Sequence, residues 1–230
     1  MQDKTILYIT ANHEPEGMLA YTQDIARKTG LPIISISHKP IDLGINICVG
    51  DVGRSGINVH RQMAIGCERA TTKYVVWCEC DTLYPPEHFK FTPTNDQKIY
   101  INKNMWRFLM RDKRYIQKRR PSVCTIISNR LHLLRVLNDM LKDVEQWVDC
   151  IEHKSIPESK HNKFKRLSDY DIEYFYTKVS VVSIFHKSGM HQKLSQTRGE
   201  KTKVIPYWPK ANKLIKELNN GNSNLDARET

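Results

Sequence analysis

The chain has 230 residues, which suits one large domain, and its apolar fraction of 40% can fill a core. No apolar run is long enough to cross a membrane, and the N-terminal stretch lacks the basic flank and long apolar core of a secretory signal. The formal net charge of +11 favours a polyanionic partner, either nucleic acid or an anionic membrane surface. Six scattered cysteines match no zinc-ligand spacing. We therefore expect a cytoplasmic protein with reduced thiols and no stable membrane insertion.

The first forty residues predict a strand, a helix and a second strand. Residues 4–10 (KTILYIT) are an apolar, β-branched run typical of an interior strand. Apolar residues then recur at helical spacing over residues 17–29, and Gly30 is a typical helix stop. Residues 31–37 (LPIISIS) predict the next strand. A strand, a helix and a strand within this length make a βαβ unit, which requires a parallel pair.

A glycine cluster follows a third expected strand at residues 45–49. Residues 50–56 (GDVGRSG) precede a helix expected over residues 58–70. The backbone N–H groups and the dipole at such a helix start favour an anion, and Arg54 would add a charge-assisted contact to a phosphate. The spacing matches neither a Walker loop nor GxGxxG, so an ordinary loop with a helix cap is the alternative.

Residues 74–89 place two carboxylates at the end of a buried strand. The apolar run YVVW leads directly into Glu79 and Asp81, and a Pro-Pro turn and His88 follow. Ligands of open α/β sheets bind beyond the carboxyl ends of strands, and buried carboxylates are costly unless a cation compensates them. We therefore expect this pair to bind a divalent cation, Mn²⁺ or Mg²⁺, beside a phosphate. The alternative is a simple strand end and turn, with His88 capping the turn.

The second half of the chain alternates apolar runs with basic segments. Strands are expected at residues 98–101, 123–128 and 179–185, the last ending at His186. Ser128 or Asn129 is expected to cap a helix whose apolar side carries Leu131, Leu134, Leu137 and Leu141. A further basic, loop-like region covers residues 154–165, and a short helix reaches Leu218. The polar residues 219–230 are expected to form a flexible tail.

Residues 107–120 (RFLMRDKRYIQKRR) are the most basic stretch. They hold seven basic residues against one acidic residue, with Phe108 and Tyr115 interleaved. We expect a basic helical or loop region that meets a polyanion.

These features resemble a known family. The segments TILYITANHEPE and NVHRQMAIGCERATTKYVVWCECDTLYPPEHF look like the nucleotide-sugar half of a family-2-like GT-A glycosyltransferase. The resemblance implies a Rossmann-like α/β fold with a mostly parallel central sheet and flanking helices. It also implies one domain over residues 1–218, with a donor-binding half of about 1–100 and an acceptor-binding half of about 101–218. In that family the strand delivers a DxD metal motif, whereas Glu replaces the first Asp here.

The resemblance assigns a role to individual residues. A nucleotide sugar, with a UDP-sugar favoured, would be bound by Thr10, Asn12, Glu14, Arg54, Ser55, Gln62 and Glu79. The metal ion would be held by Glu79, Asp81 and His186, and Asp81 would be catalytic. For His186, a strand-end histidine without a ligand is the alternative. The base for the acceptor hydroxyl would be Glu145 or Asp149, and the alternative for both is a solvated helix face.

The acceptor is inferred from the charge. Small GT-A enzymes of this kind resemble those encoded by bacteriophages that glycosylate hydroxymethylated pyrimidines in DNA, in the host cytoplasm. This acceptor predicts DNA contacts from Arg107, Arg111, Arg114, Lys118, Arg119 and Arg120. One alternative is transfer to a lipid-linked or cell-surface glycan, with the basic face meeting anionic lipid. Another is an inactive nucleic-acid-binding α/β module, for which two carboxylates at a metal position would have no use.

Overall fold

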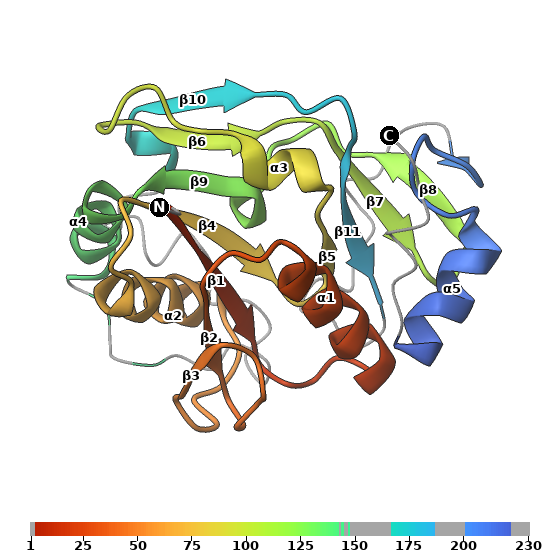
Figure 1. The fold of residues 1–230 in the computed structure, drawn as a ribbon, viewed down its shortest axis with the longest axis horizontal. Coiled ribbons are helices and arrows are strands. Elements are labelled where there is room, and N and C mark those ends of the chain that lie inside the picture. The colour runs from red at the N-terminus through yellow and green to blue at the C-terminus, as the bar shows by residue number, and fades with distance from the viewer. Residues whose placement is uncertain (1–2, 143, 145–146, 148–166, 187–200, 222–230) are drawn as a thin grey trace.

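A computed structural model describes residues 3–142, 144, 147, 167–186 and 201–221 of the chain (Figure 1). Within these residues the larger sheet has seven strands in the order β10-β6-β9-β4-β1-β2-β3. They are β1 (Lys4–Thr10), β2 (Ile33–Ser37), β3 (Ile45–Cys48), β4 (Tyr74–Glu79), β6 (Ile99–Asn102), β9 (Ile126–Asn129) and β10 (Ile172–Phe175). Neighbouring strands are parallel except where β9 pairs with β4 and β6. The prediction of an α/β fold around a mostly parallel sheet is therefore confirmed.

The interior strands β1 and β4 are the apolar runs that the sequence singles out. Every residue of β1 is buried, and β4 is buried up to its last residue, Glu79. Such continuous burial is expected where helices or further strands cover both faces of a parallel sheet. Thr10 lies opposite Ser37 of β2, and Ile9 lies opposite Glu79. The register thus brings the carboxyl ends of these three strands to one edge.

A smaller sheet begins where the carboxylate pair ends. In the described residues it has five strands in the order β12-β8-β7-β11-β5. They are β5 (Thr82–Leu83), β7 (Met105–Leu109), β8 (Arg114–Gln117), β11 (Val181–Phe185) and β12 (Lys201–Thr202). The β5 strand starts directly after Asp81, and the amide of Ile184 in β11 donates to the carbonyl of Asp81 at 2.7 Å. The smaller sheet therefore lies directly next to Asp81.

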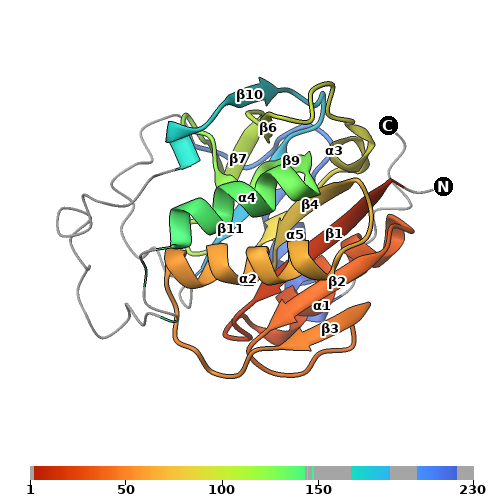
Figure 2. The same cartoon turned by 90° about the vertical axis from the view of Figure 1, so that its left-hand side faces the viewer.

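Helices cover the two sheets in separate groups. They are α1 (Glu16–Lys28), α2 (Gly56–Arg69), α3 (Pro86–Lys90), α4 (Arg130–Leu141) and α5 (Ala211–Asn220). The α2 and α4 helices lie side by side over one face of the larger sheet (Figure 2), where Met63 and Leu137 join a core with Leu7 and Trp77. On the other side, α1 and α5 pack together, and Tyr21 and Leu214 join a core with Phe108 of the smaller sheet. None of the helices in the described parts of the chain has the length and apolar content needed to cross a membrane.

The structure corrects the expectation for the basic segment. Residues 107–120 are not a helix or a loop but mainly an antiparallel hairpin of β7 and β8, with Phe108 opposite Tyr115. Both aromatic side chains are buried in the core beneath α1 and α5. Lys113 turns the chain with a φ of 50°. Alternating apolar residues on both sides of this turn explain why the segment forms strands despite its charge.

Smaller corrections concern the ends of elements. The strand expected over residues 123–128 begins only at Ile126, and Asn129 caps α4 by accepting from the amides of Leu131 and His132. Leu131 is 62% exposed and is not part of the apolar side of that helix. The α5 helix continues to Asn220, two residues into the expected tail. Residues 222–230 and the basic region 154–165 lie outside the described residues.

Candidate functional site

Two carboxylates lie at the carboxyl end of the buried strand β4, Glu79 as its last residue and Asp81 just beyond it, as the sequence predicts. The indole Nε1 of Trp77 donates to Glu79 Oε1 at 3.2 Å, and Thr82 Oγ1 donates to Asp81 Oδ1 at 3.2 Å. The amide of Glu79 donates to the Tyr84 hydroxyl at 2.9 Å, and this hydroxyl in turn donates to the carbonyl of Cys124 at 2.8 Å. The turn that carries both carboxylates is therefore anchored to the buried residues around it.

The surroundings of this pair oppose its ionisation. Burial raises the pKa of Glu79 to about 8, and the charge of Asp81 contributes in the same direction. Burial also raises the pKa of Asp81 to about 6, with a further contribution from Glu14. Carboxyl groups that share a poorly hydrated site lose a proton more easily when a cation is bound there.

Glu14 is the third carboxylate of this site. It lies in the loop after β1, where Thr10 Oγ1 donates to Glu14 Oε2 at 3.2 Å and accepts from the amide of Asn12 at 2.9 Å. The structure thus brings together the three residues predicted to bind the donor in this loop. Its charge acts on both Glu79 and Asp81, so Glu14 lies within electrostatic range of the carboxylate pair. From the sequence we expected Glu14 to bind the nucleotide sugar, and its proximity to Glu79 and Asp81 was not expected.

Two cations of the β7–β8 hairpin also belong to this site. Arg107 pairs with Ile116, and the amide of Lys118 donates to the carbonyl of Met105, so both basic side chains project from one face of the hairpin. Burial lowers the pKa of both groups, whereas the nearby charge of Asp81 raises it. We expected these two residues at a DNA surface; the structure shows them half-buried and within electrostatic range of the carboxylates. Arg111, Arg119 and Arg120 are exposed, as a DNA contact requires.

The predicted donor-binding residues around α2 have different surroundings. Ser55 is buried and caps α2 by accepting from the amide of Asn58 at 3.0 Å. Gln62 is buried too, and its Nε2 donates to the carbonyl of Ile36 at 3.4 Å. These contacts give both side chains a structural role. Arg54, beside the start of α2, lies within electrostatic range of His186.

His186 is buried at the end of β11. Neither of its ring nitrogens finds a hydrogen-bond partner among the described residues. Burial and the charge of Arg54 lower its pKa, and Glu14 raises it. Its ligand atoms do not form a close group with those of Glu79 and Asp81 in the described chain, so the three predicted metal ligands are not assembled in this structure. Glu145 and Asp149 lie outside the described residues.

The residues present fit a divalent cation. Glu14, Glu79 and Asp81 offer the oxygen atoms that Mg²⁺ and Mn²⁺ prefer, and His186 offers an imidazole that Mn²⁺ accepts, but their ligand atoms must move closer together to hold one ion. Arg107 and Lys118, within electrostatic range of Asp81, can supply positive charge for phosphate oxygens.

A hollow of about 400 Å³ lies elsewhere, between α2 and α4. Its lining includes Arg61, Ile65, Asn138 and Trp147, and it lies on the helical side of the larger sheet. It holds neither of the two carboxylates that follow β4.

Comparison with known proteins adds information about the fold. No protein-family model matches the sequence, and no curated protein matches it. Among solved structures, the chain is similar to the inositol-1-phosphate CTP transferase from T. maritima, with a TM-score of 0.51, 11% identity and 96% of each chain covered. A second solved structure is a glycosyltransferase involved in the glycosylation of the major capsid of PBCV-1, with a TM-score of 0.45, 10% identity, and coverage of 79% of this chain and 92% of that chain. The chain therefore shares, over nearly its whole length, the fold of the T. maritima transferase.

Proposed function

We propose that this protein is a metal-dependent glycosyltransferase that moves a sugar from a nucleotide-sugar donor to a hydroxyl acceptor. The observation that carries the proposal is the pair Glu79 and Asp81 at the carboxyl end of β4, with the charges of Glu14, Arg107 and Lys118 within electrostatic range. Carboxylates can hold a divalent cation, and the two basic groups can bind a diphosphate. A metal-bound diphosphate is a ligand that requires both negative and positive side chains in one poorly hydrated site.

The residues suggest how the site would act on such a donor. Bound Mn²⁺ or Mg²⁺ would supply Lewis-acid stabilisation of the charge that develops on the departing diphosphate. Arg107 and Lys118 would hold oxygen atoms of the same group, where fixed charges are most effective because water is largely excluded. Thr10 and Asn12 would position the nucleoside from the loop after β1.

The acceptor in this proposal is a hydroxymethylated pyrimidine base in DNA. Support comes from the net charge of +11 and from the exposed Arg111, Arg119 and Arg120, which belong to or follow the hairpin that carries Arg107 and Lys118. Phosphate contacts from these arginines would hold the duplex beside the donor site. The target base would then have to be reached in a groove or flipped out of the stack.

A second candidate is nucleotidyl transfer from CTP to a sugar phosphate or a similar alcohol phosphate. It is supported by the similarity in fold to the T. maritima enzyme over 96% of each chain. This support is an analogy at the level of the fold, and it is weak because one fold can serve many different enzymes. Glycosyl transfer is preferred because of the sequence resemblance around Glu79 and Asp81.

One experiment compares these activities. The purified protein would be incubated with UDP- and GDP-sugars and Mn²⁺ or Mg²⁺, together with DNA that does or does not contain hydroxymethylcytosine. We expect sugar on the modified base only, detected by mass after nuclease digestion, and no product with EDTA. Asp81→Asn should abolish the product while circular dichroism stays unchanged, and Asp42→Asn, at an exposed position, should retain it.

Other outcomes would change the proposal. Metal-dependent release of UDP or GDP without sugar on DNA would contradict the DNA acceptor and retain the glycosyltransferase. Release of pyrophosphate from CTP with a sugar phosphate would favour the second candidate. An active Asp81→Asn variant would contradict the assignment of the site itself.

A further inference from the structure

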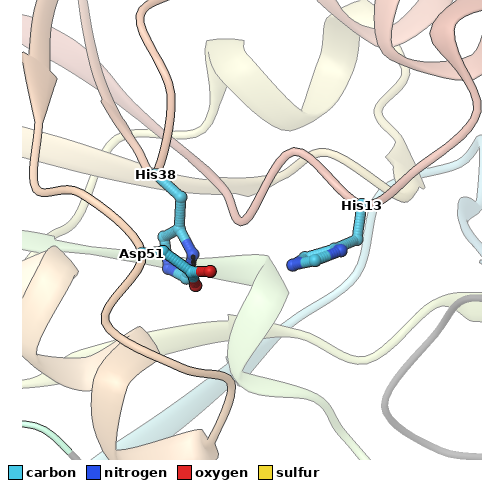
Figure 3. A group of neighbouring side chains, drawn as sticks. All are labelled: His13, His38 and Asp51. Atoms are coloured by element: carbon cyan, nitrogen blue, oxygen red, sulfur yellow. Dashed lines mark ion pairs between the residues drawn. The ribbon is translucent and has the colours of Figure 1, made fainter.

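A group of two histidines and one aspartate lies at the same edge of the sheet, apart from Glu79 and Asp81. His13 lies in the loop after β1, His38 directly follows β2, and Asp51 lies in the loop after β3. One ligand atom from each of the three lies within 4.8 Å of the others. Figure 3 shows His38 and Asp51 next to each other, with the ring of His13 directed toward them. Three separate loops therefore converge on one point.

The buried member of this group has an unused nitrogen. His38 is only 5% exposed, and its Nδ1 has no hydrogen-bond partner among the described residues. The nearest charged group is Asp51 Oδ1, at 3.6 Å. A buried polar atom without a partner is costly, so its presence calls for a ligand that would accept the lone pair. Burial lowers the pKa of His38, which keeps the imidazole neutral as a metal ligand must be.

Backbone contacts fix the relative positions of the loops. Asn12, whose φ is 58°, accepts at its Oδ1 from the amide of Lys39 at 2.9 Å, so the residues next to His13 and His38 are joined directly. The thiol of Cys48 donates to the carbonyl of His38 at 3.3 Å, which ties the end of β3 to the same residue. These contacts hold His38 in place, whereas the exposed side chains of His13 and Asp51 can rotate.

We propose that His13, His38 and Asp51 form a binding site for a transition-metal ion, with Zn²⁺ as the best match. Two imidazoles and one carboxylate are a common donor set for Zn²⁺, whereas Mg²⁺ prefers oxygen ligands alone. Zn²⁺ ligands lie at about 2.0–2.2 Å from the ion, so the exposed side chains must move inward from their present separation. The fourth position stays open to water or to a ligand atom. This site does not depend on the proposed glycosyltransferase activity.

The test measures metal binding directly. The full chain, freed of metal with a chelator, would be titrated with Zn²⁺ alone by calorimetry, and with Co²⁺ while its visible absorption is recorded. We expect one Zn²⁺ site, a Co²⁺ spectrum of low coordination number, and a higher melting temperature with Zn²⁺ because the ion joins three loops. His13→Ala and Asp51→Ala should each weaken binding by at least about tenfold without loss of fold, since both side chains are exposed.

Matched controls separate this site from the carboxylates. Asp42→Ala removes an exposed carboxylate from the loop between β2 and β3, and Asp81→Asn alters the candidate active site; both should bind Zn²⁺ as the unchanged protein does. Because Zn²⁺ can also bind at the carboxylates, both variants are measured in the Asp81→Asn background. Zn²⁺ binding there that survives both His13→Ala and Asp51→Ala would mean that other residues hold the ion and would overturn the proposal. Absence of any Zn²⁺ binding to the folded, unchanged protein would overturn it as well.

Discussion

At the scale of single residues, the main feature is a set of carboxylates held where they ionise with difficulty. Glu79 is the last residue of β4, Asp81 lies two residues further on, and Glu14 in the loop after β1 lies within electrostatic range of both. Burial is the first cause of the raised pKa values of Glu79 and Asp81, and the second is a neighbouring carboxylate, which is Asp81 for Glu79 and Glu14 for Asp81. Perturbed groups of this kind gather at functional sites, although ion networks without a function also produce them. A site built in this way gives up some stability of the empty protein.

The cost should appear as a dependence of stability on pH at Glu79. Because the pKa of Glu79 is raised to about 8 in the folded protein, the folded state holds this proton after the unfolded chain has lost it near pH 4.5. The free energy of unfolding therefore falls as pH rises through this window. Glu79→Gln should stabilise the metal-free protein by about 1 kcal/mol or more near pH 8, with little effect near pH 4.5.

Urea denaturation of both proteins across this pH range measures the effect. Glu68→Gln on α2 is the control, because Glu68 is exposed and its substitution should leave the pH dependence unchanged. If Glu79→Gln is destabilising near pH 8, the carboxylate is stabilised where it lies, and the account of its environment is wrong.

Part of this site was visible in the sequence and part was not. Glu79 and Asp81 are recognisable because two carboxylates directly follow an apolar strand. The approach of Arg107 and Lys118 depends on the hairpin register and on the parallel pairing of β7 with β11, which joins residues about eighty positions apart. The Asp112–Lys113 turn between alternating apolar residues was the available signal for that hairpin, and the charge of the segment obscured it.

At the scale of elements, the strands were more predictable than their partners. The β1 and β4 strands were recognisable from continuous apolar runs, because a parallel interior strand is apolar on both faces. The contact of α1 with α5 was not recognisable from the sequence, because it joins helices from opposite halves of the chain. At this contact Gly17 lies so close to α5 that an added Cβ would come within 2.3 Å of the carbonyl oxygen of Leu218.

Gly17→Ala should therefore destabilise the protein. The methyl group would overlap backbone atoms that cannot move without shifting α5, so we expect a loss of about 1–3 kcal/mol. Gly56→Ala is the matched control, because Gly56 also lies in the first turn of a helix but has open space around its Cβ position. Equal stabilities of the two variants in thermal denaturation would contradict the close approach of α1 and α5.

At the scale of the whole molecule, the basic side chains of residues 107–120 have different surroundings. Some basic side chains face the carboxylates, as Arg107 and Lys118 do, and others such as Arg111 and Arg119 are exposed. The basic stretch was read from the sequence as one surface, because composition does not reveal which side of a strand a residue occupies. Among the described residues of this stretch, the exposed arginines are the best placed for an extended contact with DNA of the kind that the charge of +11 suggests.

Replacing Arg111, Arg119 and Arg120 with serine should weaken binding to duplex DNA and reduce the salt dependence of the affinity. The slope of log K against log salt should fall by about 0.9 for each phosphate contact that is lost. The control removes the same charge from exposed positions near the amino ends of the larger sheet's strands, by replacing Lys28, Arg69 and Lys73 with serine. Fluorescence anisotropy at several salt concentrations measures both variants, and equal slopes would show that these arginines do not contact DNA.

We propose above all that Asp81 and its neighbours bind a nucleoside diphosphate through a divalent cation. This proposal is tested most directly by calorimetric titration of UDP and GDP into the protein, with Mn²⁺ and after its removal by EDTA. We predict that one nucleotide binds only with Mn²⁺ present, and that Asp81→Asn weakens this binding by at least about tenfold while the fold is unchanged. Nucleotide binding that is equally strong without the metal ion and in the Asp81→Asn variant would contradict the account.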